Sequence, residues 1–160
     1  MYNTRKDLLD AFRSAPTILE VLLAGCTQEQ ARAARGGDEN WSVVEVVCHL
    51  RDAEEHSLER MRRMRDEPHP SVAGLDQEAL ARERNYAEAD LHEALSAFVH
   101  LRAEHVAELE ALAPEEWERG GRHEKYGNIT ISAQTTRLIP HDYQHLAQIA
   151  SQLTALGGKA

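Results

Sequence analysis

Two histidines, His141 and His145, stand four residues apart in the segment IPHDYQHLAQI near the end of the chain. In a helix this spacing is about one turn, so both imidazole rings lie on one face, with Cβ atoms about 6 Å apart. Two imidazoles at that spacing can bind one divalent metal ion, as paired histidines do in helical zinc sites. The pair alone is a weak signal, because the chain contains nine histidines and such a spacing arises easily by chance.

The direction in which the two rings point strengthens the signal. The helix predicted over residues 131–156 has an apolar stripe when its residues are placed at about 100° intervals. The stripe consists of four residues: Ile131, Leu138, Ile149 and Leu156. His145 falls in the middle of this stripe, Asp142 close to its centre and His141 on its edge. Burying a polar group without a partner costs a few kcal/mol, so these three indicate either a hydrogen-bonded core network or a metal or catalytic site.

A catalytic metal usually has three protein ligands and an open position, so a third donor is required. His49 is the best candidate, at the edge of the apolar stripe of a helix predicted over residues 42–66, although a lone histidine at such an edge is more often simply packed. His56 lies about 10.5 Å further along the same helix and cannot share a metal with His49. His105, on the inward stripe of the next long helix, is a core histidine, a ligand or a pocket group.

Charged residues on the inward faces also require partners. Glu54 and Arg102 lie near the centres of the inward faces of two neighbouring helices, and a buried charge is costly unless it is paired. We therefore predict a buried ion pair between them, either purely structural or forming the floor of a pocket. Asp142 can orient a histidine as a hydrogen-bond acceptor, and we expect this contact to be made across helices rather than with its neighbour in sequence.

Two further carboxylates flank His49 by about one turn on either side. Glu45 and Asp52 lie nearer the solvent face of the predicted helix, and we expect both to be solvated. The residue types do not identify a general base, and Asp142 and Glu45 both remain open for that role.

Length and composition restrict the class of protein. A chain of 160 residues predicts one domain over residues 1–160. Charged residues make up 28% and hydrophobic residues 42%, as in soluble proteins, and aromatic residues only 5%. The net charge of −9 argues against a nucleic-acid surface, which needs a basic patch. No stretch approaches the roughly 18 apolar residues of a membrane span.

The first residues and the two cysteines indicate the cell compartment of the protein. Charges among residues 1–12 exclude the apolar core of a secretory signal. Cys26 and Cys48 both sit among apolar neighbours and form no CxxC motif, so we expect reduced thiols. Together these features predict a cytoplasmic protein.

Hydrophobic periodicity predicts an all-α fold. The long helices are expected over residues 4–24, 42–66, 88–112 and 131–156, with a short helix near 77–84. Ser42 and Glu45 form an S-x-x-E capping box at the start of the second, and Thr130 is a plausible cap for the fourth, which Gly157 and Gly158 end. The architecture is a four-helix bundle with long connections, whose core is a usual place for metal sites.

Two details of this architecture bear on the histidine pair. The roughly 15 residues after Pro114 are predicted as a loop, and loops of that length are uncommon unless they have a function. No strand is expected anywhere in the chain. Pro140 lies inside the fourth helix with its ring directed outward, and it predicts a kink just before His141.

The segment WSVVEVVCHLRDAE, at residues 41–54, followed by HDYQHLAQI, at residues 141–149, resembles the DinB-like superfamily of small bacterial four-helix bundles, which includes the YfiT-like group assigned as metal-dependent hydrolases. The resemblance extends over nearly the whole chain in length, helix order and spacing. It implies that His49, His141 and His145 bind a divalent metal, commonly zinc, nickel or iron, with water completing the shell. It also implies a homodimer.

The resemblance implies an enzyme acting on a small molecule. The activities it suggests are the transfer of a low-molecular-weight thiol such as bacillithiol, mycothiol or glutathione to an electrophile, which we favour, and hydrolysis. Glu54, Arg102, His105 and Asp142 are then expected to line or support the pocket. Two alternatives remain open: a non-catalytic metal- or ligand-binding bundle related to stress, and a structural bundle without metal.

Overall fold

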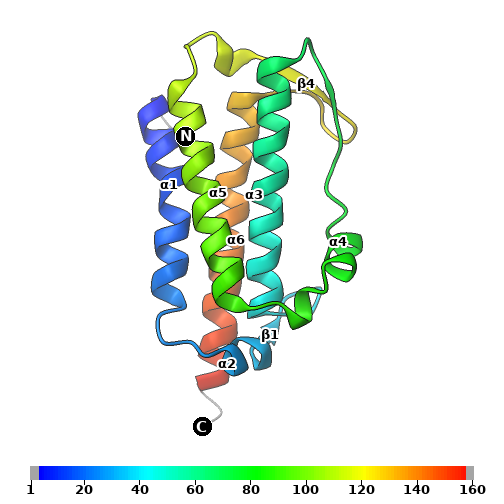
Figure 1. Ribbon diagram of the computed structural model, residues 1–160. Helices are drawn as coiled ribbons and strands as arrows, with labels where there is room; N and C mark the ends of the chain where they lie inside the picture. The colour runs from blue at the N-terminus through cyan, green and yellow to red at the C-terminus, as the bar shows by residue number, and fades with distance from the viewer. Residues whose placement is uncertain (1–3, 158–160) are drawn as a thin grey trace.

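The computed structural model describes residues 4–157. Four long helices run side by side along the molecule in Figure 1. Their bounds are α1 Arg5–Leu22, α3 Val43–Asp66, α5 Leu91–Ala111 and α6 Ile131–Gly157. The predicted four-helix bundle is therefore confirmed, and each helix begins and ends within about three residues of the expected position. Gly158, expected at the end of the last helix, lies outside the described residues.

The helices begin where their capping residues predict. The Ser42 hydroxyl accepts a hydrogen bond from the backbone N–H of Glu45, and the Glu45 carboxylate accepts one from the backbone N–H of Ser42. This reciprocal pair is the predicted capping box and satisfies two otherwise unpaired donors. Thr130 also accepts from the backbone N–H of Ala133, at 3.1 Å, as expected of a cap. Both helices that carry the candidate ligands thus have a defined starting residue.

Short elements connect the four helices: α2 Gln28–Ala33, α4 Gln77–Glu83 and the 3₁₀ turns η1 Tyr86–Glu88 and η2 Glu116–Glu118. The expectation of no strands was wrong. The strands are β1 Arg35–Gly36, β2 Trp41–Ser42, β3 Ser71–Val72, β4 Gly120–His123 and β5 Gly127–Thr130. β1 pairs antiparallel with β2, while β4 pairs antiparallel with β5 and parallel with β3.

The connection after Pro114 is therefore a hairpin rather than an irregular loop. Gly120 is required in it, because a Cβ at that position would lie 2.2 Å from the carbonyl oxygen of Ile129 on the partner strand. Gly127 supplies the positive φ of +69° in the turn. Period-two alternation of apolar residues is absent from these short strands, which is why hydrophobic periodicity missed them.

The bundle core consists of two apolar clusters with a charged layer between them. One cluster lies toward α2 and contains Val47, Phe98 and Leu146 among others. The other lies toward the hairpin and contains Phe12, Leu58 and Val106 among others. Between these clusters, α3 places the buried polar residue Glu54, α5 places Arg102 and His105, and α6 places Asp142. This layer is where the candidate site residues gather.

Three further expectations concern single features. Pro140 is exposed inside an otherwise continuous α6, so its ring points outward as predicted. Cys26 and Cys48 have free thiols, the first partly buried and the second buried. No helix within residues 4–157 has the length and apolar character needed to cross a bilayer.

Candidate metal centre

Three histidine rings from two helices meet between α3 and α6. His49 is buried, and His141 and His145 are partly buried. His49 comes from α3, while His141 and His145 come from successive turns of α6. One ligand nitrogen from each ring can be chosen so that all three lie within 4.8 Å of one another. The ring centroids of His49 lie 5.2 Å from His141 and 4.7 Å from His145. The structure thus brings together all three predicted ligands.

Neighbouring side chains hold each ring in place. The Trp41 ring packs against His49 at a centroid distance of 5.3 Å. His145 Nδ1 lies 2.9 Å from Gln148 Oε1, which as an acceptor fixes the proton on Nδ1 and leaves Nε2 free. His141 Nδ1 lies 3.3 Å from Asp142 Oδ1, with the same consequence. Two imidazoles therefore present an Nε2 lone pair, which is the arrangement that second-sphere acceptors produce in metal sites.

The cluster fits a divalent ion by two observations. A tetrahedral ion with metal–nitrogen bonds of 2.0–2.1 Å holds its ligand nitrogens about 3.4 Å apart, and Nε2 of His49 lies 3.1 Å from Nε2 of His141. His49 Nδ1 is buried without a hydrogen-bond partner among the described residues, so these residues leave the ring free to take the tautomer that a metal would require. The three residues present are thus suitable in number, donor type and spacing.

Burial also favours the protonation state that binds metals. It lowers the pKa of His49 to about 3, an effect to which His145 and His141 add, and it lowers the pKa of His145 as well. Both imidazoles are therefore neutral at physiological pH. A neutral imidazole can donate its lone pair to a metal without first losing a proton.

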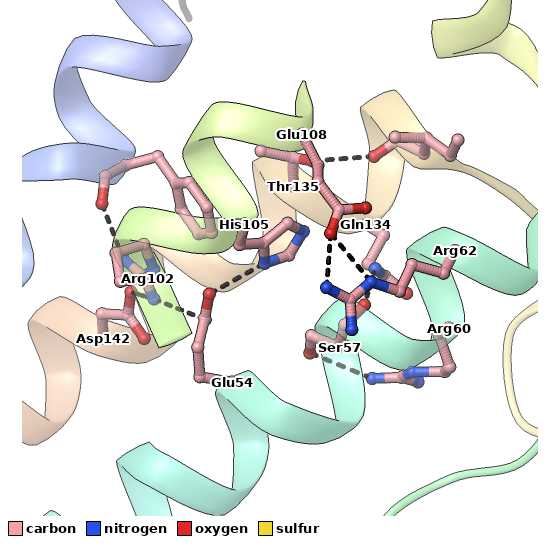
Figure 2. Close-up of polar contacts among 12 residues, drawn as sticks. Glu54, Ser57, Arg60, Arg62, Arg102, His105, Glu108, Gln134, Thr135 and Asp142 are labelled. Atoms are coloured by element: carbon pink, nitrogen blue, oxygen red, sulfur yellow. Dashed lines mark hydrogen bonds and ion pairs between the residues drawn. The ribbon is translucent and has the colours of Figure 1, made fainter. Parts of the chain in front are cut away.

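Behind the histidines lies a buried network of four charged or polar residues (Figure 2). Arg102 donates to Glu54 at 2.8 Å and to Asp142 at 2.7 Å, and His105 Nδ1 lies 2.8 Å from the other oxygen of Glu54. Arg102 also donates to the carbonyl oxygen of Phe12 at 2.6 Å. The predicted pair of Glu54 and Arg102 is present, and it is part of a larger layer that joins α1, α3, α5 and α6.

The charges in this layer stabilise one another. Burial alone raises the pKa of Glu54, but Arg102 and His105 outweigh it and hold that pKa at about 2. Burial likewise opposes the charge of Arg102, but Glu54 and Asp142 keep the pKa of Arg102 above its ordinary value. Glu54 is consequently ionised at neutral pH. His105 belongs to this network and lies outside the three-histidine cluster, which answers the question left open for it.

Three expectations for carboxylates need correction. Asp142 contacts its own neighbour, His141, in addition to Arg102 across the bundle, because its two oxygens point in different directions. Asp52 is buried rather than solvated, since η1 and the residues after α4 cover it: Tyr86 donates to it at 2.5 Å and Arg84 at 2.8 Å. Glu45 is only 12% exposed and pairs with Arg35 at 2.9 Å.

A cavity of about 800 Å³ adjoins the cluster between α3, α6 and the hairpin. His49 and His141 form part of its wall, together with apolar side chains such as Ala53 and Leu138. Its volume lies within the range of small-molecule sites. None of Glu54, Arg102, His105 and Asp142 lines it. Asp142 contacts His141 directly, and the other three join it through the buried network.

Several residues of the site were missed by the sequence analysis. Gln148 follows His145 by three positions, a spacing that places both on one helix face and was the available signal. His123 was assigned to a loop, but it is buried in β4 and lines the cavity. Arg60 and Arg137 also line the cavity. Arg60 comes three turns after His49 and Arg137 one turn before His141. Their sequence pattern gave no signal, because arginines on a helix are usually solvated.

Comparison with known proteins agrees with this architecture. The sequence profile of the DinB superfamily matches residues 11–149, and the chain belongs to this superfamily. Among solved structures, the fold is similar to that of YfiT from Bacillus subtilis, which is described as a probable metal-dependent hydrolase with an unusual four-helix bundle topology. That match has a TM-score of 0.86 and 24% sequence identity, and it covers 98% of this chain and 90% of the other. No curated protein sequence gives a significant match.

Proposed function

We propose that this protein is a divalent-metal-dependent enzyme that acts on a small molecule, with His49, His141 and His145 as the metal ligands. The observation that carries the proposal is the position of the three-histidine cluster at the wall of a cavity. Three protein ligands leave at least one coordination position for water or substrate. A purely structural site would instead have a closed shell of four protein ligands.

Each part of the site has a role in this proposal. A bound divalent ion supplies Lewis acidity, lowering the pKa of a coordinated water or thiol toward neutrality. Asp142 and Gln148 hold His141 and His145 in the ligating tautomer. Apolar side chains of the cavity wall such as Ala53 and Leu138 offer packing surface to a substrate. Imidazole ligands suit zinc, nickel and iron, so any of these can be the ion.

The leading reaction is transfer of a low-molecular-weight thiol to an electrophile, and hydrolysis is the second. Both earlier candidates for a general base, Asp142 and Glu45, are held in ion pairs outside the cavity. A thiol needs no general base once its pKa is lowered, which favours the transferase. The description of YfiT as a probable hydrolase favours the second reaction.

Metal binding is the first test of the proposal. Untagged protein incubated with Zn²⁺, Ni²⁺ or Fe²⁺ and then dialysed is expected to retain about one equivalent, measured by elemental analysis. Excess metal at about 100 times its dissociation constant should stabilise the fold by about 2.7 kcal/mol. His145→Ala should lose both effects, and His92→Ala, which changes an exposed histidine of α5, should lose neither. Retention below about a tenth of an equivalent would contradict the proposal.

The second test separates the two reactions. The metal-loaded protein is assayed with bacillithiol, mycothiol or glutathione and a chromogenic aryl halide, and separately with a chromogenic ester. Metal-dependent conjugation that His145→Ala abolishes supports the transferase, and metal-dependent ester cleavage without thiol supports the hydrolase. Metal binding with neither activity would favour a non-catalytic metal-binding bundle. The predicted homodimer is a separate question, decided by the molecular mass in solution.

A further inference from the structure

Arg60 of α3 is a half-buried cation without a carboxylate partner among residues 4–157. Its side-chain hydrogen bonds are long. Nη1 lies 3.5 Å from the carbonyl oxygen of Ala73, and Nη2 lies 3.4 Å from the hydroxyl of Ser57, as Figure 2 shows. Its Nε is buried and has no hydrogen-bond partner. A guanidinium has five N–H donors arranged to bind an anion, and a buried charge left without one is costly.

The other arginines of the chain show how unusual this is. Six have a pKa that neighbouring carboxylates raise above the ordinary value against the effect of burial: Arg51, Arg62, Arg63, Arg65, Arg84 and Arg102. Burial lowers the pKa of Arg60 instead, because no carboxylate is near enough to compensate. In a chain with a net charge of −9, in which acidic residues are abundant, a half-buried arginine that no carboxylate of residues 4–157 accompanies indicates a site for an external anion.

The surroundings of Arg60 support the same reading. It lines the cavity beside the three-histidine cluster, and Arg137 and Lys125 line the same cavity without an ion-pair partner among the described residues. Arg137 packs over the Tyr126 ring at 4.1 Å. The two carboxylates of the wall, Asp76 and Glu124, each accept one backbone N–H, from Ala79 and Gly74 respectively, and keep their charge. The three cations outnumber them, so the charged side chains give the wall a net positive charge.

The positions along the helices define the shape of that ligand. Arg137 precedes His141 by one turn, and Arg60 follows His49 by three turns, about 16 Å along α3. Apolar side chains of Ala53, Ile129 and Leu138 lie in the cavity wall. A ligand that reaches from the histidines to Arg60 therefore has an apolar or neutral middle and a negative group at the end next to the hairpin.

We propose that this cavity selects small organic molecules that carry a carboxylate or phosphate group, which Arg60 binds while Arg137 and Lys125 of the same wall attract it. A planar guanidinium matches both of these anions with paired hydrogen bonds. The anion site is a property of the protein side chains alone. Only the placement of the reacting group at the histidines rests on the proposed metal-dependent function.

The test uses matched probes with and without the charge, in the presence of a chelator so that no metal can bind the anion. Calorimetric titration compares 4-phenylbutanoate and phenyl phosphate with the uncharged 4-phenylbutanol. At least one anion is expected to bind about tenfold more tightly than the alcohol. The preferred anion identifies the chemical class. Arg60→Gln should abolish the preference, and Arg122→Gln should preserve it, since Arg122 is exposed on β4 and does not line the cavity.

The experiment distinguishes the anion site at Arg60 from the metal centre. Equal affinity for the acids and the alcohol, no binding below about 10 mM, or an equal loss in Arg60→Gln and Arg122→Gln overturns the anion site. If Arg60→Gln does not fold, Arg60→Lys and Arg137→Gln replace it, and each should weaken anion binding. His145→Ala should retain the preference for anions even where it has lost metal, so failure of the metal centre leaves the anion site intact and the reverse also holds.

Discussion

Asp142 connects the histidine cluster to the buried charges behind it through its two oxygens. Oδ1 lies 3.3 Å from Nδ1 of His141, and Oδ2 accepts from Arg102 at 2.7 Å. Because Arg102 is itself held by Glu54, the carboxylate of Asp142 has little freedom to turn away. A rigid acceptor behind a ligating imidazole fixes its tautomer and raises its basicity. The same side chain therefore serves both stability and the orientation of His141.

Asp142→Asn is predicted to weaken metal binding about 10- to 100-fold, because an uncharged amide orients His141 less firmly and lowers its basicity. The measurement is a competition titration with a chelating dye at constant pH. The matched control is Glu54→Gln, which also removes one carboxylate from Arg102 but does not touch His141. Both variants should lose stability, but only Asp142→Asn should lose metal affinity. Equal affinities in the two variants would contradict the assigned role.

At the scale of elements, the hairpin of β4 and β5 closes one end of the cavity and supplies its His123, Tyr126 and Ile129. It is anchored to β3 and to the start of α6, where the backbone N–H of Ile131 donates to the carbonyl oxygen of Arg119 at 2.9 Å. The hairpin therefore has two fixed ends. Gly120 allows the two strands to approach each other, and Gly121 allows β4 to approach Pro70 in the loop before β3.

Gly120→Ala is predicted to destabilise the protein by about 1–3 kcal/mol, because the new methyl group would lie 2.2 Å from the backbone oxygen of Ile129 and the strands would have to separate. Urea unfolding measures the difference. Gly157→Ala is the control, since a Cβ there meets nothing within 4 Å and alanine favours a helix. A Gly120→Ala variant as stable as Gly157→Ala would mean that the hairpin is not packed as described.

The long helices were predictable from the sequence because each carries its own local signals. The capping box of Ser42 and Glu45 and the period of the apolar residues fixed α3 before any tertiary contact was known. The meeting of His49 with His141 and His145 followed from the faces they occupy and from the resemblance to the DinB-like superfamily. The helix face on which a residue lies depends on its spacing along the chain, so it can be predicted from the sequence.

The remaining parts of the site depend on contacts between distant segments. Asp52 looked solvent-facing on its own helix, and only the packing of Tyr86 and Arg84 against it makes it buried. Arg60 differs from the paired arginines because no carboxylate of residues 4–157 approaches it, and no local sequence pattern reveals this. The strands are two to four residues long and are fixed by pairing rather than by propensity.

At the scale of the whole molecule, the charged layer of Glu54, Arg102, His105 and Asp142 divides the apolar core into two clusters. All four helices contribute to it, because Arg102 also donates to the carbonyl oxygen of Phe12 in α1. A buried layer of this kind costs desolvation energy, which its internal pairs offset only when all members are present. Removing one carboxylate should therefore affect the stability of the entire bundle.

Glu54→Gln is predicted to lower the free energy of unfolding by about 3 kcal/mol at pH 7, the lower end for a broken buried pair, since Asp142 still accompanies Arg102. The loss should depend on pH. The pKa of Glu54 is about 2 in the folded protein and 4.5 ordinarily, so its stabilisation is complete above about pH 4.5 and disappears as pH falls toward 2. Urea unfolding at pH 7, 4 and 3 should show the free energies of unfolding of the unchanged protein and of Glu54→Gln converging.

Glu55→Gln is the control. Glu55 forms a half-exposed pair with Arg84, so this change should cost less than about 1 kcal/mol at each pH. A pH-independent gap would place the role of Glu54 in packing rather than in its charge.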